Sequence, residues 1–334
     1  MKVLITTDWY EPVINGVVTS VMNLSRKLRE RGHEVKILTL SRTCHSYIEG
    51  DVIYAGSIGM GCIYPQARVK IPTVAGDYME MLLDWKPDIV HSQCEFSTFF
   101  LAKKIASELH IPIVHTYHTV YEDYTHYFSP QKAWGRNIVQ LMTRKLANAV
   151  ETLIAPSDKI RKILEGYQVS CPVEVIPSGI SLEKYQACKE EDWQEKIRAQ
   201  LGIPQDALVL VYVGRMAKEK NIEELLEYQQ EAEKYGVILL LVGDGPHLPE
   251  LKKKAEELKV TEHVIFTGMI APEEVGHYYQ AGDLFVSASI SERKILYVPQ
   301  NTLGNYILCS CLILQLSSDV LSYISTKLFY QILL

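Results

Sequence analysis

The chain has 334 residues, enough for two domains of ordinary size. Its 47% hydrophobic and 22% charged residues are typical of a globular enzyme and exclude disorder, collagen-like repeats and a coiled coil. The net charge of −6 argues against a general nucleic-acid binder. Residues 1–177 carry 19 basic and 18 acidic side chains and the remainder 15 and 22. Affinity for an anionic surface must therefore come from local patches in the first part.

Cysteine spacing and hydropathy indicate a cytoplasmic protein. The seven cysteines form no Cys-x-x-Cys pair and no zinc-finger spacing, so we expect reduced thiols. Asp8 and Glu11 interrupt the apolar start, which is unlike a signal peptide. The apolar run at residues 306–316 is about half the ~20 residues that span a bilayer, so we expect no membrane-spanning segment.

Strands and helices alternate through the first part of the chain. The apolar run Lys2–Thr6 predicts a strand, and helically spaced valines and leucines over 17–31 predict a helix that Gly32 ends. The further expected elements are strands at 34–40, 87–91, 111–116 and 152–155 and helices at 99–109 and 133–149. This alternation implies right-handed crossovers and a parallel, doubly wound α/β sheet.

The same alternation restarts after residues 184–206, a polar stretch that we interpret as a linker or surface helix. Strands are expected at 208–213, 237–242, 264–267 and 284–287, with helices at 222–235, 248–258 and 272–281. Two open α/β domains in tandem bind ligands at the carboxyl ends of their strands. We therefore expect the ligand in a cleft between the domains.

Two loops of the first part carry residues suited to binding. Gly16 precedes a predicted helix, where backbone N–H groups can face a phosphate or sugar; the alternative is a turn that needs a small residue. His115 lies at the end of a predicted strand and His118 and His126 follow it, and an imidazole there can bind a hydroxyl or act as a general acid or base. Metal binding is disfavoured because these histidines lack carboxylate or cysteine partners at ligand spacing. A polar loop packed by tyrosines is the other alternative.

A basic helix with one tryptophan follows this loop. Trp134 can lie at a membrane interface while cations contact anionic lipid headgroups. The candidate cations are Arg136, Arg144 and Lys145. An ordinary helix with a solvated basic face is an equally good interpretation.

The second part places cations and glycines after its strands. Arg215 and Lys220 follow a strand where a helix begins, and two fixed cations there suit a diphosphate leaving group; a solvated loop is the alternative. The turn at 243–246 is glycine-rich but lacks the G-x-G-x-x-G fingerprint, and there is no Walker lysine loop. The chain is therefore not a typical dehydrogenase or P-loop ATPase.

Taken in order, these segments resemble the retaining nucleotide-sugar glycosyltransferases of sequence family 4, which have the GT-B fold of two Rossmann-like domains facing a cleft. The resemblance covers residues 1–292 and is greatest to the bacterial enzymes that glucosylate diacylglycerol, whose His-Thr-Tyr-His-Thr … Tyr-Glu-Asp-Tyr stretch is similar to residues 115–124. The matching segments are Asn15-Gly16-Val17, His118 to Tyr124, Ala155 to Ser157, Ile176 to Ile180, Val213 to Arg215, Glu219 to Asn221, Gly243 to Pro246, Phe266 to Met269 and Phe285 to Glu292.

The resemblance implies a UDP-sugar donor, a lipid acceptor such as diacylglycerol and peripheral attachment to the inner face of the cell membrane, without a metal or other cofactor. It implies that Gly16 lies against the donor phosphate or sugar, that Arg215 and Lys220 hold the diphosphate, and that Met269 meets the base. His118 and Glu292 would contact the transferred sugar as the catalytic residues. Tyr121 and Tyr124 lie in the stretch assigned to the acceptor.

The chain departs from the family pattern after Glu292. A second carboxylate is expected eight positions on, where Gln300 stands, and Pro299 would break the expected helix. We therefore expect domains at 1–177 and 178–292, the second one truncated, and an atypical tail at 293–334. A shifted reading frame near the Glu292 codon is our hypothesis, and a natural variant terminus is the alternative. Three functions stay open: transfer to a lipid, transfer to a non-lipid acceptor, and a remnant that binds without turnover.

Overall fold

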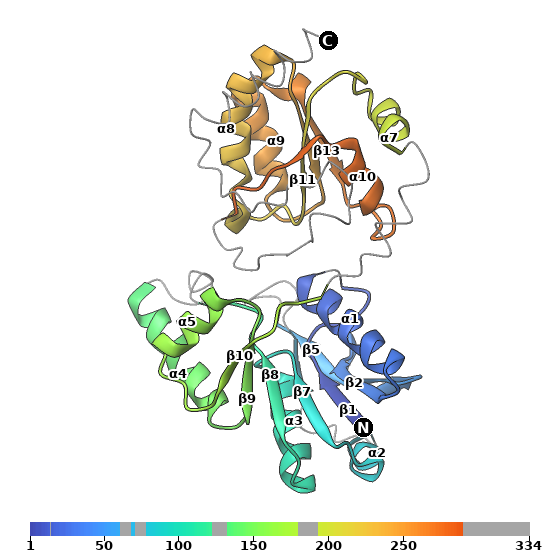
Figure 1. Cartoon of the computed structure of the whole chain (residues 1–334), viewed down its shortest axis with the longest axis vertical. Helices are drawn as coiled ribbons and strands as arrows, with labels where there is room; N and C mark the ends of the chain where they lie inside the picture. Colours follow the sequence, from blue (N-terminus) through green and yellow to red (C-terminus); the bar gives the residue numbers. More distant parts are fainter. Residues whose placement is uncertain (14, 61–67, 71–77, 122–131, 180–192, 290–334) are drawn as a thin grey trace. The chain divides into compact units, whose positions relative to one another are not determined.

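The structure is a computed structural model that describes residues 1–13, 15–60, 68–70, 78–121, 132–179 and 193–289. The chain divides into two compact units, Met1–Ile180 and Ser181–Leu334, which are described separately (Figure 1). Within the described residues, no helix combines the length and apolar character that crossing a bilayer requires.

The first unit is built on an eight-stranded sheet with the order β10-β9-β8-β7-β1-β2-β4-β3. All neighbours pair in parallel except β3 and β4. The strands are β1 (Lys2–Thr6), β2 (Glu34–Leu40), β3 (Tyr47–Glu49), β4 (Val52–Ala55), β7 (Ile89–Ser92), β8 (Ile113–Thr116), β9 (Thr152–Ala155) and β10 (Val173–Val175). A separate antiparallel hairpin joins β5 (Ser57–Gly59) to β6 (Arg68–Lys70).

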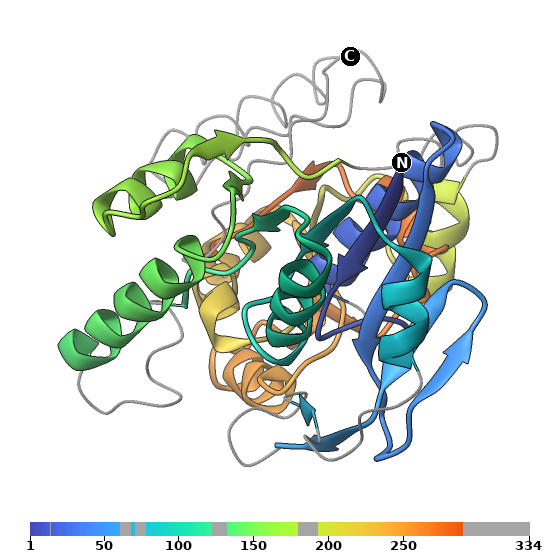
Figure 2. The same ribbon diagram turned by 90° about the horizontal axis from the view of Figure 1, so that it is seen from below.

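In the part of the first unit that the structure describes, five helices pack around this sheet. Side chains alternate along a strand, so Val3 and Ile5 of β1 pack with Val21 of α1, whereas Leu4 belongs to a larger core that includes Leu38. Figure 2 looks onto α2 and α3, which pack against each other. The helices are α1 (Gly16–Glu30), α2 (Tyr78–Trp85), α3 (Ser97–Leu109), α4 (Lys132–Ala147) and α5 (Asp158–Gly166).

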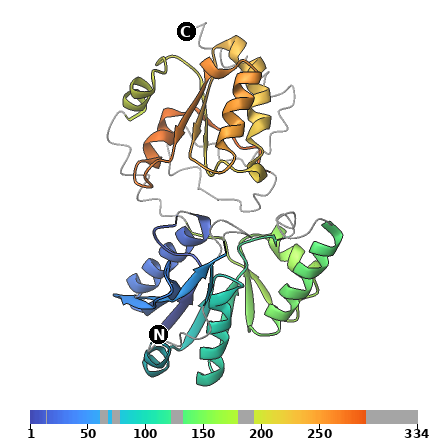
Figure 3. The same cartoon turned by 180° about the vertical axis from the view of Figure 1, so that it is seen from behind.

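The second unit carries a parallel sheet of four strands with the order β13-β12-β11-β14. Buried residues of α8 and α9 form one core with Leu239 and Leu241, while α7 and α10 form another with Leu240 on the opposite face (Figure 3). The elements are α7 (Trp193–Leu201), β11 (Val209–Val213), α8 (Ile222–Ala232), β12 (Ile238–Val242), α9 (Leu248–Glu257), β13 (Val264–Gly268), α10 (Val275–Ala281) and β14 (Leu284–Phe285), with short 3-10 turns η3 (Lys218–Lys220), η4 (Glu233–Tyr235) and η5 (Thr261–His263).

A buried ion pair attaches α7 to the second sheet. The guanidinium of Arg198, 3% exposed, lies 2.9 Å from Asp283, and it also donates to the backbone oxygens of Ala281, Gln205 and Ala207. Because every side of the cation has an oxygen partner, the charge is compensated where water is excluded. The polar stretch at 184–206 thus contains a packed helix, one of the two interpretations given above.

The doubly wound α/β architecture predicted from the alternation is confirmed. Each strand named in the prediction is present, with ends that differ by a few residues. The predicted strand at 111–116 begins at Ile113 because Pro112 has no N–H to donate to a neighbouring strand. The short strands β3 to β6 and β10 were not predicted, since runs of three or four residues show too little periodicity, and the eight-residue helix α2 was missed as well.

Candidate active site

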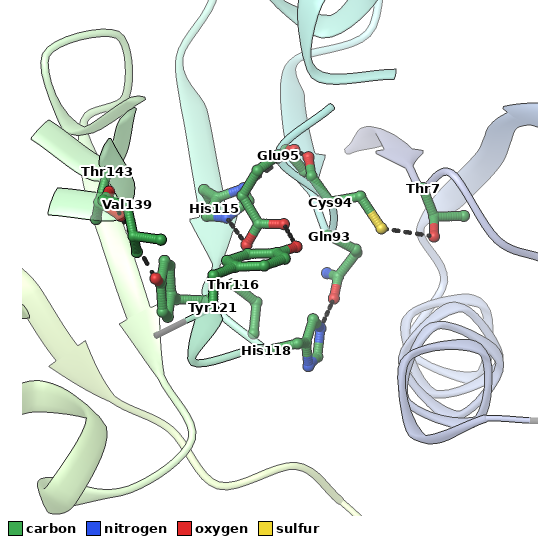
Figure 4. Close-up of polar contacts among 12 residues, drawn as sticks. Thr7, Gln93, Cys94, Glu95, His115, Thr116, His118, Tyr121, Val139 and Thr143 are labelled. Atoms are coloured by element: carbon green, nitrogen blue, oxygen red, sulfur yellow. Dashed lines mark hydrogen bonds and ion pairs between the residues drawn. The ribbon is translucent and has the colours of Figure 1, made fainter. Parts of the chain in front are cut away.

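Polar side chains gather where β1, β7 and β8 of the first sheet end (Figure 4). Thr7 follows β1, Gln93 and Glu95 follow β7, and His118 follows β8. Strand order reverses at β1, which lies between β2 and β7. Ligands of doubly wound sheets bind outside the carboxyl ends of the strands at such a reversal, so this edge is the candidate site of the first unit.

A buried glutamine holds the imidazole of His118. The ring Nε2 lies 2.6 Å from Oε1 of Gln93 (Figure 4). Gln93 is only 2% exposed, and its backbone N–H donates to the oxygen of Thr6 at 2.8 Å. The partner of His118 is thus itself attached to the central strand, which fixes the position of the ring.

Glu95 makes a second set of contacts from the same loop. The hydroxyl of Tyr121 donates to Oε2 of Glu95 at 2.5 Å, and Nε2 of His115 lies 3.4 Å from Oε1. The other nitrogen of His115 lies 3.1 Å from the hydroxyl of Ser92. Burial, and then the charge of Glu95, raises the pKa of Tyr121 well above its usual range. Tyr121 therefore stays protonated, and its proton is engaged by Glu95.

Asp8 lies buried at the same edge and holds the start of α3. Its Oδ1 accepts the backbone N–H of Thr98 at 2.8 Å, in the first turn of that helix. Burial raises the pKa of Asp8 to about 6, although the hydrogen bonds from Thr98 oppose the shift. Asp8 is thus a carboxylate whose charge is disfavoured by its surroundings.

Helix α1 begins at Gly16, at the carboxyl end of β1. The side chain of Asn15 accepts the backbone N–H of Val18 at 2.9 Å and so caps the helix. Gly16 has no positive φ, and a Cβ added there would meet nothing within 4 Å. The fold therefore does not require a glycine at position 16, which removes the turn-based explanation for it.

Glycines bring two loops of the second unit into close contact. A Cβ on Gly243 would lie 2.0 Å from the oxygen of Gly214, and one on Gly245 would lie 2.3 Å from the oxygen of Met216. The backbone N–H of Met216 donates to the oxygen of Asp244 at 2.9 Å. Direct backbone packing of the β11 and β12 ends thus explains the glycine-rich turn.

Arg215 and Lys220 lie at this edge of the second sheet. Arg215 directly follows Gly214 at the end of β11, and Lys220 closes the 3-10 turn that precedes α8. Arg215 forms an ion pair with Glu219, whose side chain is only 8% exposed. The hydroxyl of Ser289, beyond β14, lies 3.5 Å from the backbone oxygen of Glu219. The cations are thus held on a short, internally bonded turn.

An acid at the start of α8 balances some of this positive charge. Glu223 lies 2.5 Å from Nε2 of His247. Burial alone raises the pKa of Glu223, but the hydrogen bond from His247 and the charge of Lys218 outweigh it, so the pKa is lowered. The edge therefore carries fixed charges of both signs.

Met269 follows β13 and is 63% exposed. Gly268 before it has a φ of +74° and accepts the backbone N–H of Gly243 at 3.0 Å. The structure thus brings Arg215, Lys220 and Met269 to the carboxyl edge of one sheet, as Gly16 and His118 come to the carboxyl edge of the other.

The predicted membrane helix, α4, exposes both apolar and basic side chains. Leu141 and Met142 are 54% and 48% exposed, and Arg136 and Lys145 are exposed as well. Arg144 differs because its Nε donates to the backbone oxygen of Tyr167 at 2.6 Å. That contact connects α4 to the end of α5, so Arg144 has a structural role here.

Some of the predicted residues lie outside the described part of the chain. These are Tyr124, Glu292 and the side chain of Trp134. Among the residues that are described, no three His, Cys, Asp or Glu side chains are grouped as metal ligands. The prediction of metal-independent chemistry stays a prediction.

Three polar residues of the first edge were missed in the sequence: the buried Asp8 and Gln93 and the partly buried Glu95. All three follow predicted strands of the parallel sheet, as His118 does. The loop after residue 116 was singled out because ligands bind at the carboxyl ends of parallel strands. The loops after residues 6 and 92 also follow parallel strands, so the same rule would have identified them.

Solved structures with the same arrangement of elements identify the fold. HepE of Anabaena in complex with UDP superposes with a TM-score of 0.65 at 17% identity, over 88% of this chain and 77% of that one. Sucrose-phosphate synthase of Thermosynechococcus elongatus gives a TM-score of 0.63 at 18% identity, over 86% and 75%. The fold is that of the GT-B glycosyltransferases.

Sequence comparison identifies the family. Residues 14–184 match the model of Glycosyltransferase Family 4, and residues 194–293 match that of Glycosyl transferases group 1. An alpha-monoglucosyldiacylglycerol synthase of Streptococcus pneumoniae is 37% identical over 88% of this chain and 67% of its own length. One of Acholeplasma laidlawii is 31% identical over 88% and 76%. The chain belongs to glycosyltransferase family 4 and is a hexosyltransferase.

Proposed function

We propose that the protein transfers glucose from UDP-glucose to diacylglycerol with retention of configuration. The observation that carries this proposal is the 37% identity to an alpha-monoglucosyldiacylglycerol synthase over 88% of the chain. A second synthase with the same description is 31% identical over the same share. The choice of sugar and acceptor depends on few contacts, which the fold alone does not specify. The shared description of the two relatives therefore supports the proposal more strongly than the fold of either unit does.

We assign the binding of the donor's diphosphate to two cations, Arg215 and Lys220, and to the start of helix α1. Arg215 can grip phosphate oxygens with two N–H groups, and Lys220 supplies a point charge. Gly16, at the start of α1, allows the sugar or phosphate to approach the backbone closely, and the open space around it supports this role. Met269 contacts the base, in keeping with its exposure at the end of β13.

On the sugar, His118 and Glu292 are the proposed catalytic residues. His118 contacts the transferred sugar near its reacting carbon, and Glu292 binds the hydroxyls of the donor sugar. The acceptor attacks from the face that the diphosphate leaves, and the leaving diphosphate takes the acceptor's proton. Arg215 and Lys220 stabilise the charge that develops on the leaving group.

Access to a lipid acceptor requires contact with the membrane surface, and α4 is the proposed contact. Leu141 and Met142 lie exposed one turn before Lys145. Apolar side chains next to a cation match the boundary between acyl chains and anionic headgroups. Tyr121 and Tyr124 are assigned to the acceptor. The hydroxyl proton of Tyr121 is engaged by Glu95, and its ring packs edge-on against Phe96 and Tyr117.

The test is transfer from radiolabelled UDP-glucose to diacylglycerol in mixed micelles that contain an anionic lipid, with and without EDTA. We expect a glycolipid whose anomeric carbon has the α configuration by NMR, formed equally well with the chelator. GDP-mannose and UDP-galactose are the donor controls, and a soluble glucoside is the acceptor control. Transfer to the soluble acceptor alone would replace the lipid by a non-lipid acceptor. Tight UDP binding without any transfer would identify a binding remnant.

A further inference from the structure

One residue of the second unit, His247, contacts both ends of the segment that carries the two proposed donor cations. The backbone N–H of His247 donates to the oxygen of Met216 at 3.0 Å, and its ring Nε2 lies 2.5 Å from Oε1 of Glu223. His247 precedes α9 and Glu223 lies in the first turn of α8, and these two helices are side by side (Figure 1). Residues 215–223, here called the cation segment, are thus attached at both ends to the start of α9.

The contact between His247 and Glu223 is a charge-assisted hydrogen bond. Burial raises the pKa of Glu223, but the hydrogen bond from His247 and further contacts outweigh it, so the pKa is lowered and the carboxyl group is ionised at neutral pH. An ionised carboxylate can only accept a hydrogen bond, so Nε2 of His247 carries the proton. Such bonds are about twice as strong as bonds between neutral groups. The contact therefore stabilises the α8 end of the cation segment.

The middle of the cation segment depends on its ends. Met216 and Ile222 are fully buried, whereas none of the three residues of η3 between them is buried. Arg215 pairs with Glu219, so the first cation is connected to this turn. The spacing between the two cations is therefore set mainly by the ends of the segment, which His247 holds.

We propose that His247 is a positioning residue for the donor, whose contact with Glu223 keeps the two cations of the segment at a spacing that suits the two phosphate groups of a diphosphate. The inference rests on the proposed function, which assigns Arg215 and Lys220 to the diphosphate. A nucleoside diphosphate offers one phosphate group to each cation, whereas a monophosphate has a single group to share. His247 would therefore contribute to the selectivity for a diphosphate.

The variant His247→Asn removes the contact with Glu223 and little else. The asparagine side chain is too short to reach the position of Nε2, while the backbone N–H that donates to Met216 is kept. Residue 247 is the N-cap of α9, and asparagine is among the residues favoured at that position, so α9 itself is not weakened.

The first measurement needs no ligand. Hydrogen exchange of the full chain, followed by mass spectrometry, reports how often the backbone N–H groups of the cation segment open. We expect about tenfold faster exchange there in His247→Asn, because a hydrogen bond to a charged group is lost. Unchanged exchange overturns the proposal, and this result is independent of the identity of the donor.

The second measurement is calorimetric titration with UDP and with UMP, without added metal. His247→Asn should weaken UDP binding about tenfold but UMP binding only about twofold, so the preference for UDP falls about fivefold. His247→Gln places an amide N–H near the position of Nε2 and should restore most of the lost UDP affinity. Equal losses for UDP and UMP would indicate a structural role alone and would overturn the proposal.

Glu223→Ala separates positioning from charge. Removal of a negative charge near the diphosphate would by itself strengthen UDP binding. Loss of the contact with His247 should instead weaken UDP binding, by about fivefold. Stronger UDP binding in Glu223→Ala contradicts the positioning role.

His263→Asn is the matched control. His263 lies 3.7 Å from Glu233 in the same unit, but it precedes β13 and so lies at the amino edge of the sheet. The variant should leave both the exchange of the cation segment and the preference for UDP unchanged. If the native protein does not bind UDP, the donor assignment of the proposed function fails and this inference fails with it. Native UDP binding with an unchanged preference in His247→Asn overturns the inference alone.

Discussion

The carboxyl edges of the two sheets are built in different ways. In the first unit, buried and partly buried side chains position one another: Gln93 holds His118, and Glu95 holds Tyr121 and His115. In the second unit, backbone packs directly on backbone, with glycines at the contacts. We therefore expect the stability of the first edge to change with pH. The stability of the second edge depends mainly on glycines, whose lack of a side chain allows the backbone contacts.

The largest effect should come from filling a backbone contact of the second edge. Gly243→Ala places a Cβ 2.0 Å from the oxygen of Gly214 at a φ of +134°, so both the clash and the strain destabilise the unit. We expect a loss of about 4 kcal/mol in the free energy of unfolding by urea denaturation. Gly202→Ala is the control, because its φ of +69° is also positive but no neighbour lies within 4 Å, and it should cost about 1 kcal/mol. Equal losses in the two variants would show that the close contact is unimportant.

The stability of the first unit should depend on pH through the buried carboxyl group of Asp8. Burial raises the pKa of Asp8 to about 6 from 3.8, so the folded state binds the proton more tightly than the unfolded state. Stability from this group is therefore present at low pH and falls as the pH rises from about 4 to about 6.

Asp8→Asn removes this titration but keeps an oxygen that can accept the N–H of Thr98. The variant should match the native protein near pH 4 and be more stable above pH 6.5, by up to about 3 kcal/mol. The measurement is the urea midpoint of both proteins from pH 4 to 8. A difference that is constant across this range would contradict the raised pKa.

Donor binding tests the charges of the second edge. Arg215→Ala should weaken UDP binding by about 30-fold, or about 2 kcal/mol, because charge-assisted hydrogen bonds to the diphosphate are lost. Calorimetric titration without added metal measures it. Lys234→Ala removes a cation paired with Glu231 on the surface of the same unit and should leave binding unchanged. Equal affinities in the native protein and Arg215→Ala would remove Arg215 from the donor site.

The smallest expected effect is on membrane binding. It concerns helix α4, which is outside both edges. Lys145→Gln should weaken binding to vesicles with anionic lipid by about fivefold, since one basic residue near such a surface contributes about 1 kcal/mol. Sedimentation with anionic and neutral vesicles measures it. Lys104→Gln, on the exposed surface of α3, is the control. Loss of binding with Lys104→Gln alone would assign the contact to α3 instead of α4.

Much of the fold could be predicted because apolar periodicity is a local property of the sequence. The strand Lys2–Thr6 and the helix after Gly16 were identified in this way, and so were most strands of the second unit. Helix α5 was missed although Ser157 caps it, with its hydroxyl accepting the N–H of Ile160 at 3.4 Å, because nine residues give a short pattern.

The candidate site was predictable only in part. His118, Arg215 and Lys220 could be singled out from their residue types and their places after strands. The contact between Gly243 and Gly214 could not, because it depends on how closely β11 and β12 approach at residues far apart in the chain. The Gln93–His118 pair has the same origin, since only the register of β7 on β8 brings the two loops together.

The strands at the two ends of the first sheet, β3 and β10, are only three residues long. An outer strand exposes backbone N–H and C=O groups with which a strand of another molecule can pair. At three residues, each border has few such groups. A long parallel sheet is thereby kept from growing into aggregates during synthesis and at high protein concentration.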